Sequence, residues 1–189
     1  MSSMSRTIVM LSVAALGVAA VRSPSAQPRY RLVIGDDLPN LVLPQAQGGS
    51  LALRSLRGRP LAVSFYSRYC APCQRELPAL HRAVERANHG LPPSRQVLPI
   101  VISIDSPADT QAAQAHFTPS LRWLLDFDGR ARTRFDPRTY PCTFLADAAG
   151  RVRFINRGFG PGYEIRVERW LRGLVVRGSS ESPQALPAH

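Results

Sequence analysis

Two nearly continuous apolar runs mark the centre of the chain. They are PLAVSFYS, residues 60–67, and QVLPIVISID, residues 96–105. Runs of this length without alternation are typical of strands buried on both faces of a sheet, as parallel strands are. Between them, residues 72–87 repeat apolar positions at helical spacing, with arginines mostly on the opposite side. This order predicts a strand, a helix and a parallel strand joined by a right-handed crossover.

Shorter elements are predicted around this unit. A hairpin turning at AQGGS precedes the first strand, and a short helix follows the second at residues 107–117. Residues 121–135 predict a short strand and a short helix, and residues 142–159 a hairpin turning at DAAG. The closing helix, residues 162–176, would bury an apolar face made of Ile165, Val167, Trp170, Leu171 and Leu174. We therefore expect an α/β fold with a mixed central sheet, helices on both faces and an N-terminal β-hairpin extension.

The chain starts with an apolar run that is typical of a targeting segment. Arg6 precedes TIVMLSVAALGVAAV, residues 7–21, which hold no charge. A helix of this length rises about 22 Å, less than a hydrocarbon core of roughly 30 Å. We predict that residues 1–26 are a signal peptide, cleaved after Ala20 or Ala26, or a short membrane anchor.

The rest of the chain is predicted to be one domain with a tail. Residues 27–178 suit a single core, and residues 179–189 have the composition of a disordered tail. Export would place the domain in the periplasm or another extracytoplasmic space, with membrane association through the N-terminus if the segment is retained. Such compartments are oxidising, which favours disulfides.

The net charge of +11 comes from arginine alone, because the chain has no lysine. Nucleic-acid binding would require a basic stripe with aromatics or a known reader motif, and neither is present, so no nucleic-acid partner is expected. A coding bias that replaces lysine by arginine is the simpler explanation. Attraction to an acidic partner or an anionic surface is the alternative.

Cys70 and Cys73 form the motif with the most chemistry, in SRYCAPCQRELP, residues 67–78. Proline favours the first turn of a helix, so Pro72 predicts that Cys70 lies at a helix N-terminus. Free N–H groups and the helix dipole stabilise a thiolate there, whereas Cys73 falls on the apolar face. This asymmetry suits dithiol exchange. A structural disulfide and half of a metal site are the alternatives, although no second cysteine pair or suitably spaced histidines are present, and no metal or cofactor is expected.

At this point the chain resembles the TlpA/ResA-like branch of the thioredoxin superfamily. The resemblance rests on GDDLPNLVLPQAQGGSLALRSLRGRPLAVSFYSRYCAPCQRELPAL and on WLLDFDGRARTRFDPRTYPCTFLADAAGRVRFINRGF, within about residues 35–175. It implies a thioredoxin-like fold, with Cys70 as nucleophile and Cys73 as resolving thiol. Pro141 would be the cis-proline facing the dithiol, where it and Tyr140 dock an extended substrate.

Glu76 matches the acidic residue that this family has near its active site. Independently of the family, it follows Cys73 by three residues on the same side of the helix. A partly desolvated carboxyl there has a raised pKa and can exchange a proton with the thiols. The alternative is a solvated glutamate in the first turns of a helix.

Three positions depart from the family pattern. Tyr69 stands where tryptophan is usual, and Ser64 where thioredoxins proper have a buried acid, which leaves Glu76 as the only acid near the pair in sequence. Cys142 replaces the usual threonine after the cis-proline. Strand alternation predicts that it points away from the dithiol, as a buried packing residue. A third redox or copper-binding thiol is the alternative.

The sequence thus predicts an exported thiol–disulfide oxidoreductase that reduces disulfides of specific proteins, in cytochrome c maturation or copper-site assembly. The resemblance implies a membrane dithiol donor that reduces it again. One rival is a copper chaperone using Cys70, Cys73 and Cys142. Another is a peroxiredoxin-like antioxidant, whose P-x-x-x-T-x-x-C pattern requires proline and threonine where this chain has Val63 and Ser67.

Overall fold

The computed structural model describes residues 31–176. The predicted signal peptide or anchor, residues 1–26, and the predicted tail, residues 179–189, lie outside the described residues. The first and last residues of the predicted domain, 27–30 and 177–178, lie outside them as well.

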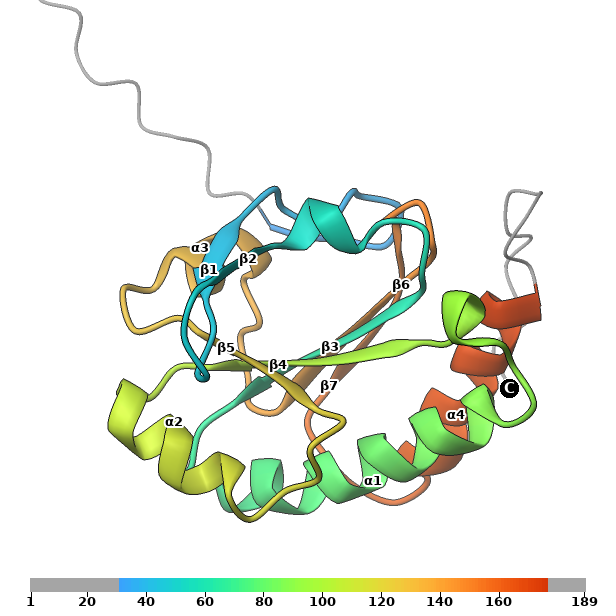
Figure 1. The fold of residues 1–189 in the computed structure, drawn as a ribbon. Coiled ribbons are helices and arrows are strands. Elements are labelled where there is room, and N and C mark those ends of the chain that lie inside the picture. Colours follow the sequence, from blue (N-terminus) through green and yellow to red (C-terminus); the bar gives the residue numbers. More distant parts are fainter. Residues whose placement is uncertain (1–30, 177–189) are drawn as a thin grey trace, which may run out of the picture.

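A five-stranded mixed sheet forms the centre of the molecule, in the order β5-β4-β3-β6-β7 (Figure 1). β3 and β4 are parallel, as are β4 and β5, whereas β6 is antiparallel to both β3 and β7. The strands are β3 (Leu61–Tyr66), β4 (Leu98–Ser103), β5 (Arg122–Leu125), β6 (Cys142–Ala146) and β7 (Val152–Arg157). The mixed sheet confirms the parallel crossover and the antiparallel hairpin that the sequence predicts.

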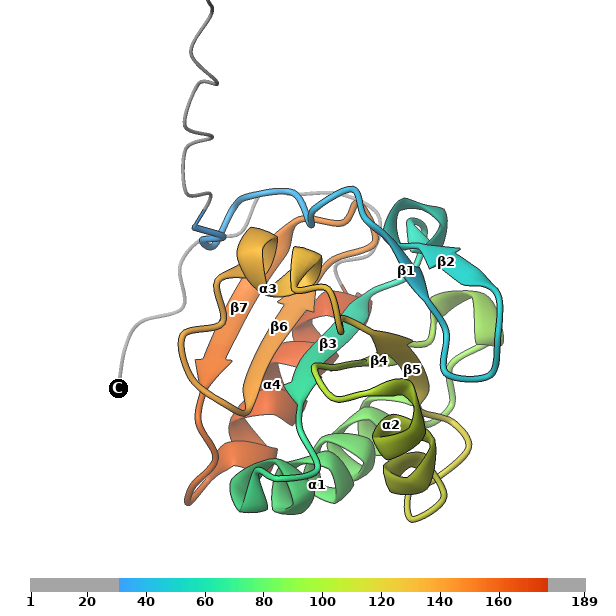
Figure 2. The ribbon, with the colours of Figure 1, turned by 90° about the vertical axis from the view of Figure 1, so that its left-hand side faces the viewer.

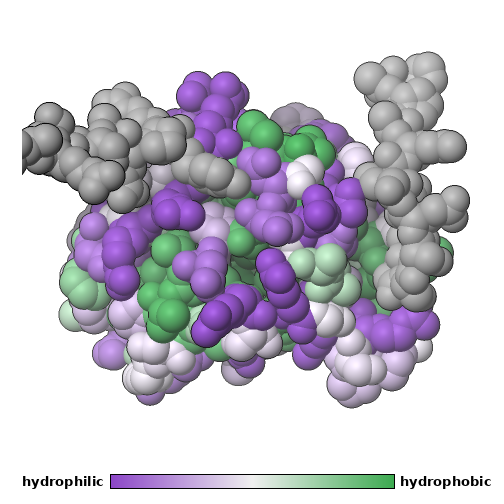
Figure 3. Space-filling view, turned by 90° about the horizontal axis from the view of Figure 1, so that it is seen from above, coloured by the Kyte–Doolittle hydropathy of each residue, from purple (hydrophilic) through white to green (hydrophobic). Residues whose placement is uncertain are grey.

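Helices cover both faces of this sheet. α1 (Ala71–Asn88) and α4 (Tyr163–Val176) lie side by side on one face, with α2 (Pro107–Gln114) at its edge (Figures 1 and 2). α3 (Arg130–Phe135) covers the other face together with the hairpin of β1 (Val42–Pro44) and β2 (Ser50–Ala52). Two 3₁₀ turns, η1 (Leu53–Leu56) and η2 (Pro93–Arg95), complete the described elements. Seen from the hairpin side, the surface mixes hydrophilic and hydrophobic patches (Figure 3).

β3 divides its side chains between two cores. Ala62 and Tyr66 pack with α1 and α4, whereas Val63 and Phe65 pack with the hairpin and α3. Successive side chains of a strand point to opposite faces, so a central strand with both faces covered requires apolar residues throughout. This explains the unbroken apolar run of residues 60–67 and makes Ser64, fully buried in the same strand, an exception.

The predicted apolar face of the last helix is wrong at one position. Val167, Leu171 and Leu174 are buried against the sheet and α1, but Ile165 is 66% exposed. Its exposure follows from helix geometry, because Ile165 precedes Val167 by two residues, and residues two apart do not share a helix face.

Candidate active site

Cys70 lies where β3 gives way to α1 (Figure 2). It is the N-cap of α1 in extended conformation, and its Sγ accepts a hydrogen bond from the Cys73 N–H at 3.2 Å. Pro72 occupies the first turn of the helix. A sulfur in this position faces the free N–H groups and the positive end of the helix dipole, both of which favour a thiolate.

The two cysteines form a disulfide and differ in exposure. Their sulfurs are 2.13 Å apart and their Cα atoms 5.2 Å apart. Cys70 is partly exposed, whereas Cys73 is fully buried in the core that α1 shares with the sheet. Only Cys70 is therefore open to attack from a partner, as the helical spacing predicts.

Asp105, just after β4, holds the loop that leads to Cys70. Its carboxylate accepts hydrogen bonds from Ser67 Oγ at 2.7 Å and from the Arg68 N–H at 2.6 Å. The Cys70 N–H donates in turn to the Ser67 carbonyl at 3.1 Å. Because β3 and β4 are parallel, their carboxyl ends meet at one edge, and the second strand can fix the loop of the first.

The peptide bond between Tyr140 and Pro141 is cis, at the entry to β6. β6 pairs antiparallel with β3, and Cys142 lies opposite Phe65. Pro141 therefore lies beside the end of β3, from which the cysteine loop departs. Pro141 is buried, and the half-buried Tyr140 ring contacts Phe65 edge-on, with centroids 6.5 Å apart. The backbone geometry predicted for Pro141 is thus present.

Glu76 is fully buried between α1 and the sheet, which rules out the solvated alternative. Ser64 Oγ donates to its Oε2 at 3.1 Å, and Thr143 Oγ1 to its Oε1 at 2.8 Å. The Tyr163 hydroxyl, from α4, also donates to Oε1. Burial raises the pKa of Glu76, and the three hydroxyl bonds oppose that rise by stabilising the carboxylate.

Cys142 lies on the far side of the sheet from Cys73. It is a free, fully buried thiol that packs with the hairpin and α3, whereas Cys73 packs with α1 and α4. Burial raises the pKa of Cys142 to about 12, which keeps the thiol protonated. Strand alternation predicts this placement. A copper site made of three thiols would need Cys142 close to the other two sulfurs, and the sheet keeps it apart from them.

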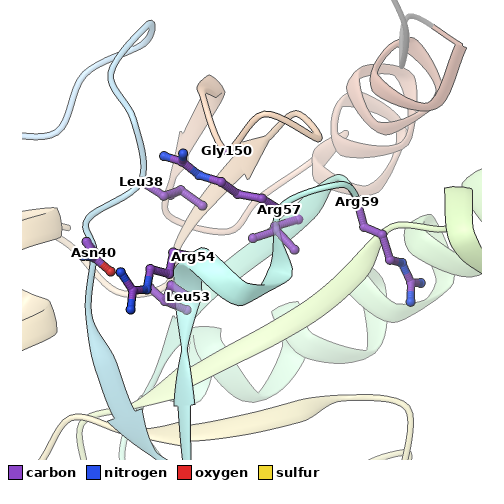
Figure 4. Close-up of a pocket in the computed structure, with 8 residues that line it drawn as sticks. Leu38, Asn40, Leu53, Arg54, Arg57, Arg59 and Gly150 are labelled. Carbon is purple, nitrogen blue, oxygen red and sulfur yellow. The ribbon is translucent and has the colours of Figure 1, made fainter.

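Hollows on the described surface include one beside the predicted site and one away from it. One, of about 470 Å³, adjoins the cysteine loop and is lined in part by Tyr66, Arg68, Gln74 and Phe117. The other, of about 250 Å³, lies beside η1 and contains none of the predicted site residues. In it Arg54 and Arg57 flank Leu38 and Asn40, while Arg59 points away from them (Figure 4). Within residues 31–176, no three His, Cys, Asp or Glu side chains gather in a way that suits a metal ion.

Comparison with known proteins now places the chain. Residues 34–155 match the family model described as AhpC/TSA family. The chain belongs to the AhpC/TSA family. Among its relatives are the thiol-disulfide oxidoreductases ResA of Bacillus subtilis, 24% identical over 77% of this chain and 78% of the relative, and of Bacillus anthracis, 27% identical over 78% and 82%.

Solved structures agree on the fold of this AhpC/TSA family member. A protein from Chlorobium tepidum, described as thiol:disulfide interchange protein DsbE, superposes with a TM-score of 0.66 at 22% identity, over 76% of this chain and 99% of that one. A secreted Mycobacterium tuberculosis disulfide oxidoreductase gives 0.55 at 19% identity, over 72% and 95%. The fold is thioredoxin-like, and the chain is a TlpA/ResA-like thiol–disulfide oxidoreductase of the thioredoxin superfamily.

Two positions bear on the peroxiredoxin alternative within the AhpC/TSA family. Val63 is buried in β3 where the peroxiredoxin pattern has proline, and Ser67 stands where it has threonine. The Ser67 hydroxyl donates to Asp105 instead of facing an open site.

Sequence reasoning missed the hydroxyl partners of Glu76. Ser64 stands out only as the replacement of an acid, and Thr143 and Tyr163 do not stand out at all. The only available signal was the polar interruption that Ser64 and Thr143 make in two buried apolar strands. Tyr163 contacts Glu76 across 87 positions of sequence, which no local pattern reveals.

Proposed function

We propose that this oxidoreductase works as a reductase of specific protein disulfides, with Cys70 as the attacking sulfur and Cys73 as the resolving one. The observation that carries the proposal is the contrast between the partly exposed Cys70 at the N-cap of α1 and the buried Cys73. An exposed sulfur can reach a partner disulfide, and a shielded one can react only within the chain.

In the proposed cycle, the Cys70 thiolate attacks a substrate disulfide and releases one substrate thiolate. The Cys73 thiolate then attacks the Cys70 sulfur, which releases the second substrate thiolate and forms the Cys70–Cys73 disulfide. Two electrons pass from the enzyme to the substrate, and a membrane dithiol donor returns two electrons and two protons. Glu76 serves as a proton carrier for the buried thiol, and Tyr140 and Pro141 dock the substrate backbone.

Cysteine variants test these roles. Cys70→Ser should abolish reduction of insulin disulfides, because no exposed thiolate remains. Cys73→Ser should accumulate a mixed disulfide with substrate, seen by mass spectrometry, because the resolving step is lost. Cys142→Val in the Cys73→Ser background is the matched control and should trap equally well. Trapping that disappears with Cys142 would overturn the assignment.

The direction of electron flow follows from the reduction potential. Equilibration with glutathione should give a value near that of thioredoxin, about −270 mV, if the protein is a reductase. A value near about −120 mV, typical of a strong oxidant, would contradict the proposed direction.

We further propose that the protein is exported and acts outside the cytoplasm, on an apocytochrome c or a copper-site assembly factor, as the resemblance implies. Its apolar residues 7–21 support export, and two similar structures are those of a secreted oxidoreductase and of an exposed lipoprotein thioredoxin. None of the helices in residues 31–176 is long and apolar enough to span a bilayer. Mass spectrometry of the mature N-terminus should find cleavage after Ala20 or Ala26, or an intact N-terminus in the membrane fraction. An intact Met1 in the soluble cytosol would contradict export.

A further inference from the structure

Three oxygens meet in a triangle beneath α1. Thr143 Oγ1 lies 2.8 Å from Glu76 Oε1 and 2.9 Å from Tyr163 Oη, and Tyr163 Oη is also hydrogen-bonded to Glu76 Oε1. The three side chains come from α1, β6 and α4, and each is at most 1% exposed. All three contacts lie in a region closed to water, so their hydrogens must come from the three groups themselves.

Counting hydrogens distinguishes the two states of Glu76. A threonine and a tyrosine each have one hydroxyl hydrogen, so an ionised Glu76 leaves two hydrogens for three contacts. A proton on Glu76 Oε1 supplies the third, and all three contacts can then be hydrogen bonds in a ring. Ser64 donates to Oε2 outside this ring in either state.

Both states fit the same positions of the heavy atoms. When Glu76 is ionised, both hydroxyls can turn their hydrogens to Oε1. When it is neutral, one of them turns to the other hydroxyl. A hydroxyl reorients by rotating its hydrogen alone, so the carboxyl can gain or lose a proton without movement of any side chain in a close-packed interior.

We propose that Tyr163 is a positioning residue for Glu76. Tyr163 and Thr143 together form a fixed frame of hydroxyl groups that accepts either protonation state of the Glu76 carboxyl. The inference rests on the proposed function of Glu76 as proton carrier and extends it to the last helix of the fold. The titratable groups that interact with Glu76 are Tyr163 on α4 and, from the other face of β6, Cys142; β3 contributes the Ser64 hydroxyl. Cys73, on the same helix, is in the disulfide and does not titrate in the oxidised protein. Burial and the three hydroxyls cause the shift in the pKa of Glu76, and no cation is among the causes.

Ion pairs lie on the surface next to the tyrosine. Glu164, the next residue, pairs with Arg82 of α1 at 2.8 Å and also with Arg86, and Glu168 contacts Arg86 at 2.5 Å. These pairs join the start of α4 to the helix that holds Glu76. Buried packing sets the relative position of the carboxyl and the phenol, and these partly exposed pairs add a small contribution.

Loss of the phenol hydroxyl should disfavour the ionised carboxyl. The hydrogen bond from Tyr163 to Glu76 Oε1 stabilises the carboxylate and lowers the pKa of Glu76, so its loss in Tyr163→Phe should favour the neutral acid. The pH midpoint at which Glu76 ionises should therefore rise. Thr143→Val should raise it as well, and Thr143→Ser, which restores the hydroxyl, should return it to the wild-type value.

Infrared spectroscopy of the full-length oxidised protein tests this directly. The carbonyl stretch of a protonated carboxyl, assigned by its loss in Glu76→Gln, gives the fraction of neutral Glu76 at each pH. Thr110→Val is the matched control, because it removes another buried hydroxyl, one that donates to Ser103 at 2.8 Å, and should leave the midpoint unchanged. A midpoint that stays in place or falls in Tyr163→Phe overturns the proposal; if that variant does not fold, the Val and Ser variants of Thr143 decide.

The rate of insulin reduction against pH is the second readout, and its midpoint should move upward with the infrared one. If the wild-type protein reduces no disulfide, the proposed reductase function fails, yet the infrared titration still decides the role of Tyr163. If the infrared midpoint moves but the rate profile does not, the frame controls the proton on Glu76 but not the exchange, and the proposed positioning role in the reaction is wrong.

Discussion

Ser64 Oγ donates a hydrogen bond to Glu76 Oε2 across 3.1 Å, at the centre of the buried contact between β3 and α1. Thioredoxins proper have an acid at this position of the strand. Here the position holds Ser64, which hydrogen-bonds to the acid that α1 supplies. A single buried carboxyl remains near the dithiol in sequence, three residues after Cys73. Any proton exchange that the dithiol needs from a nearby buried acid would therefore depend on Glu76, as proposed above.

Glu76→Gln should separate thiolate formation from exchange. Without a negative charge near the thiols, the apparent cysteine pKa should fall, because like charges no longer oppose each other. Exchange at neutral pH should nevertheless slow by about tenfold or more, since a positioned proton carrier typically contributes 10²–10⁴-fold. Ultraviolet thiolate absorbance against pH and the rate with a model disulfide measure the two effects. An unchanged curve together with an unchanged rate would show that Glu76 has no part in the reaction.

The same variant should change how stability depends on pH. Burial raises the pKa of folded Glu76 above the ordinary value of 4.5, so the folded protein keeps a proton that the unfolded chain has lost. Stability from this group is complete below that value and falls as pH rises toward the folded pKa, by at most roughly 1.4 kcal/mol per pH unit. The unfolding free energy of the wild type relative to Glu76→Gln should therefore decline above pH 4.5. Denaturant titrations at several pH values measure it, and a difference that grows with pH would contradict the burial of a neutral acid.

Asp105→Ala should loosen the cysteine loop. The change leaves the Ser67 hydroxyl and the Arg68 N–H without their carboxylate, in a region where Asp105 is only 9% exposed. We expect a loss of about 1–3 kcal/mol in the free energy of unfolding of the oxidised protein. Asp128→Ala, which removes an exposed ion pair with Arg130, is the control and should have a much smaller effect. Equal losses in both variants would mean that Asp105 does not hold the loop.

Replacement of Cys142 by an apolar residue should leave stability and activity unchanged, whereas replacement by a polar residue should lower stability. Cys142→Val keeps an apolar side chain in the core and should leave disulfide reduction intact. Cys142→Ser buries a hydroxyl among apolar neighbours and should destabilise the protein by about 1–3 kcal/mol. Urea unfolding and the insulin assay measure both variants. A loss of activity in the valine variant at unchanged stability would restore the third-thiol hypothesis.

The sequence predicts the parts of this fold that depend on local pattern. The apolar runs of residues 60–67 and 96–105 predict β3 and β4, because a strand covered on both faces is apolar throughout. Pro72 predicts that Cys70 lies at the start of α1. The surroundings of Glu76 could not be predicted, because they depend on how α4 lies against α1, and the ion pairs of Glu164 join residues about 80 positions apart. Ile165 is a different case, because its spacing of two residues from Val167 already places it off the buried face, so its exposure could have been predicted from the sequence.

Three thiols permit three different disulfide pairings, yet the sheet leaves only one. In the folded chain the sheet lies between Cys142 and the other two sulfurs, because Cys142 and Cys73 pack in the cores on its opposite faces. A disulfide from Cys142 to Cys70 or to Cys73 is therefore incompatible with the fold. The folded, oxidised protein should therefore be a single covalent species, with Cys142 free, which peptide mapping by mass spectrometry can check. A chain that handles the disulfides of other proteins would in this way be protected from scrambling its own.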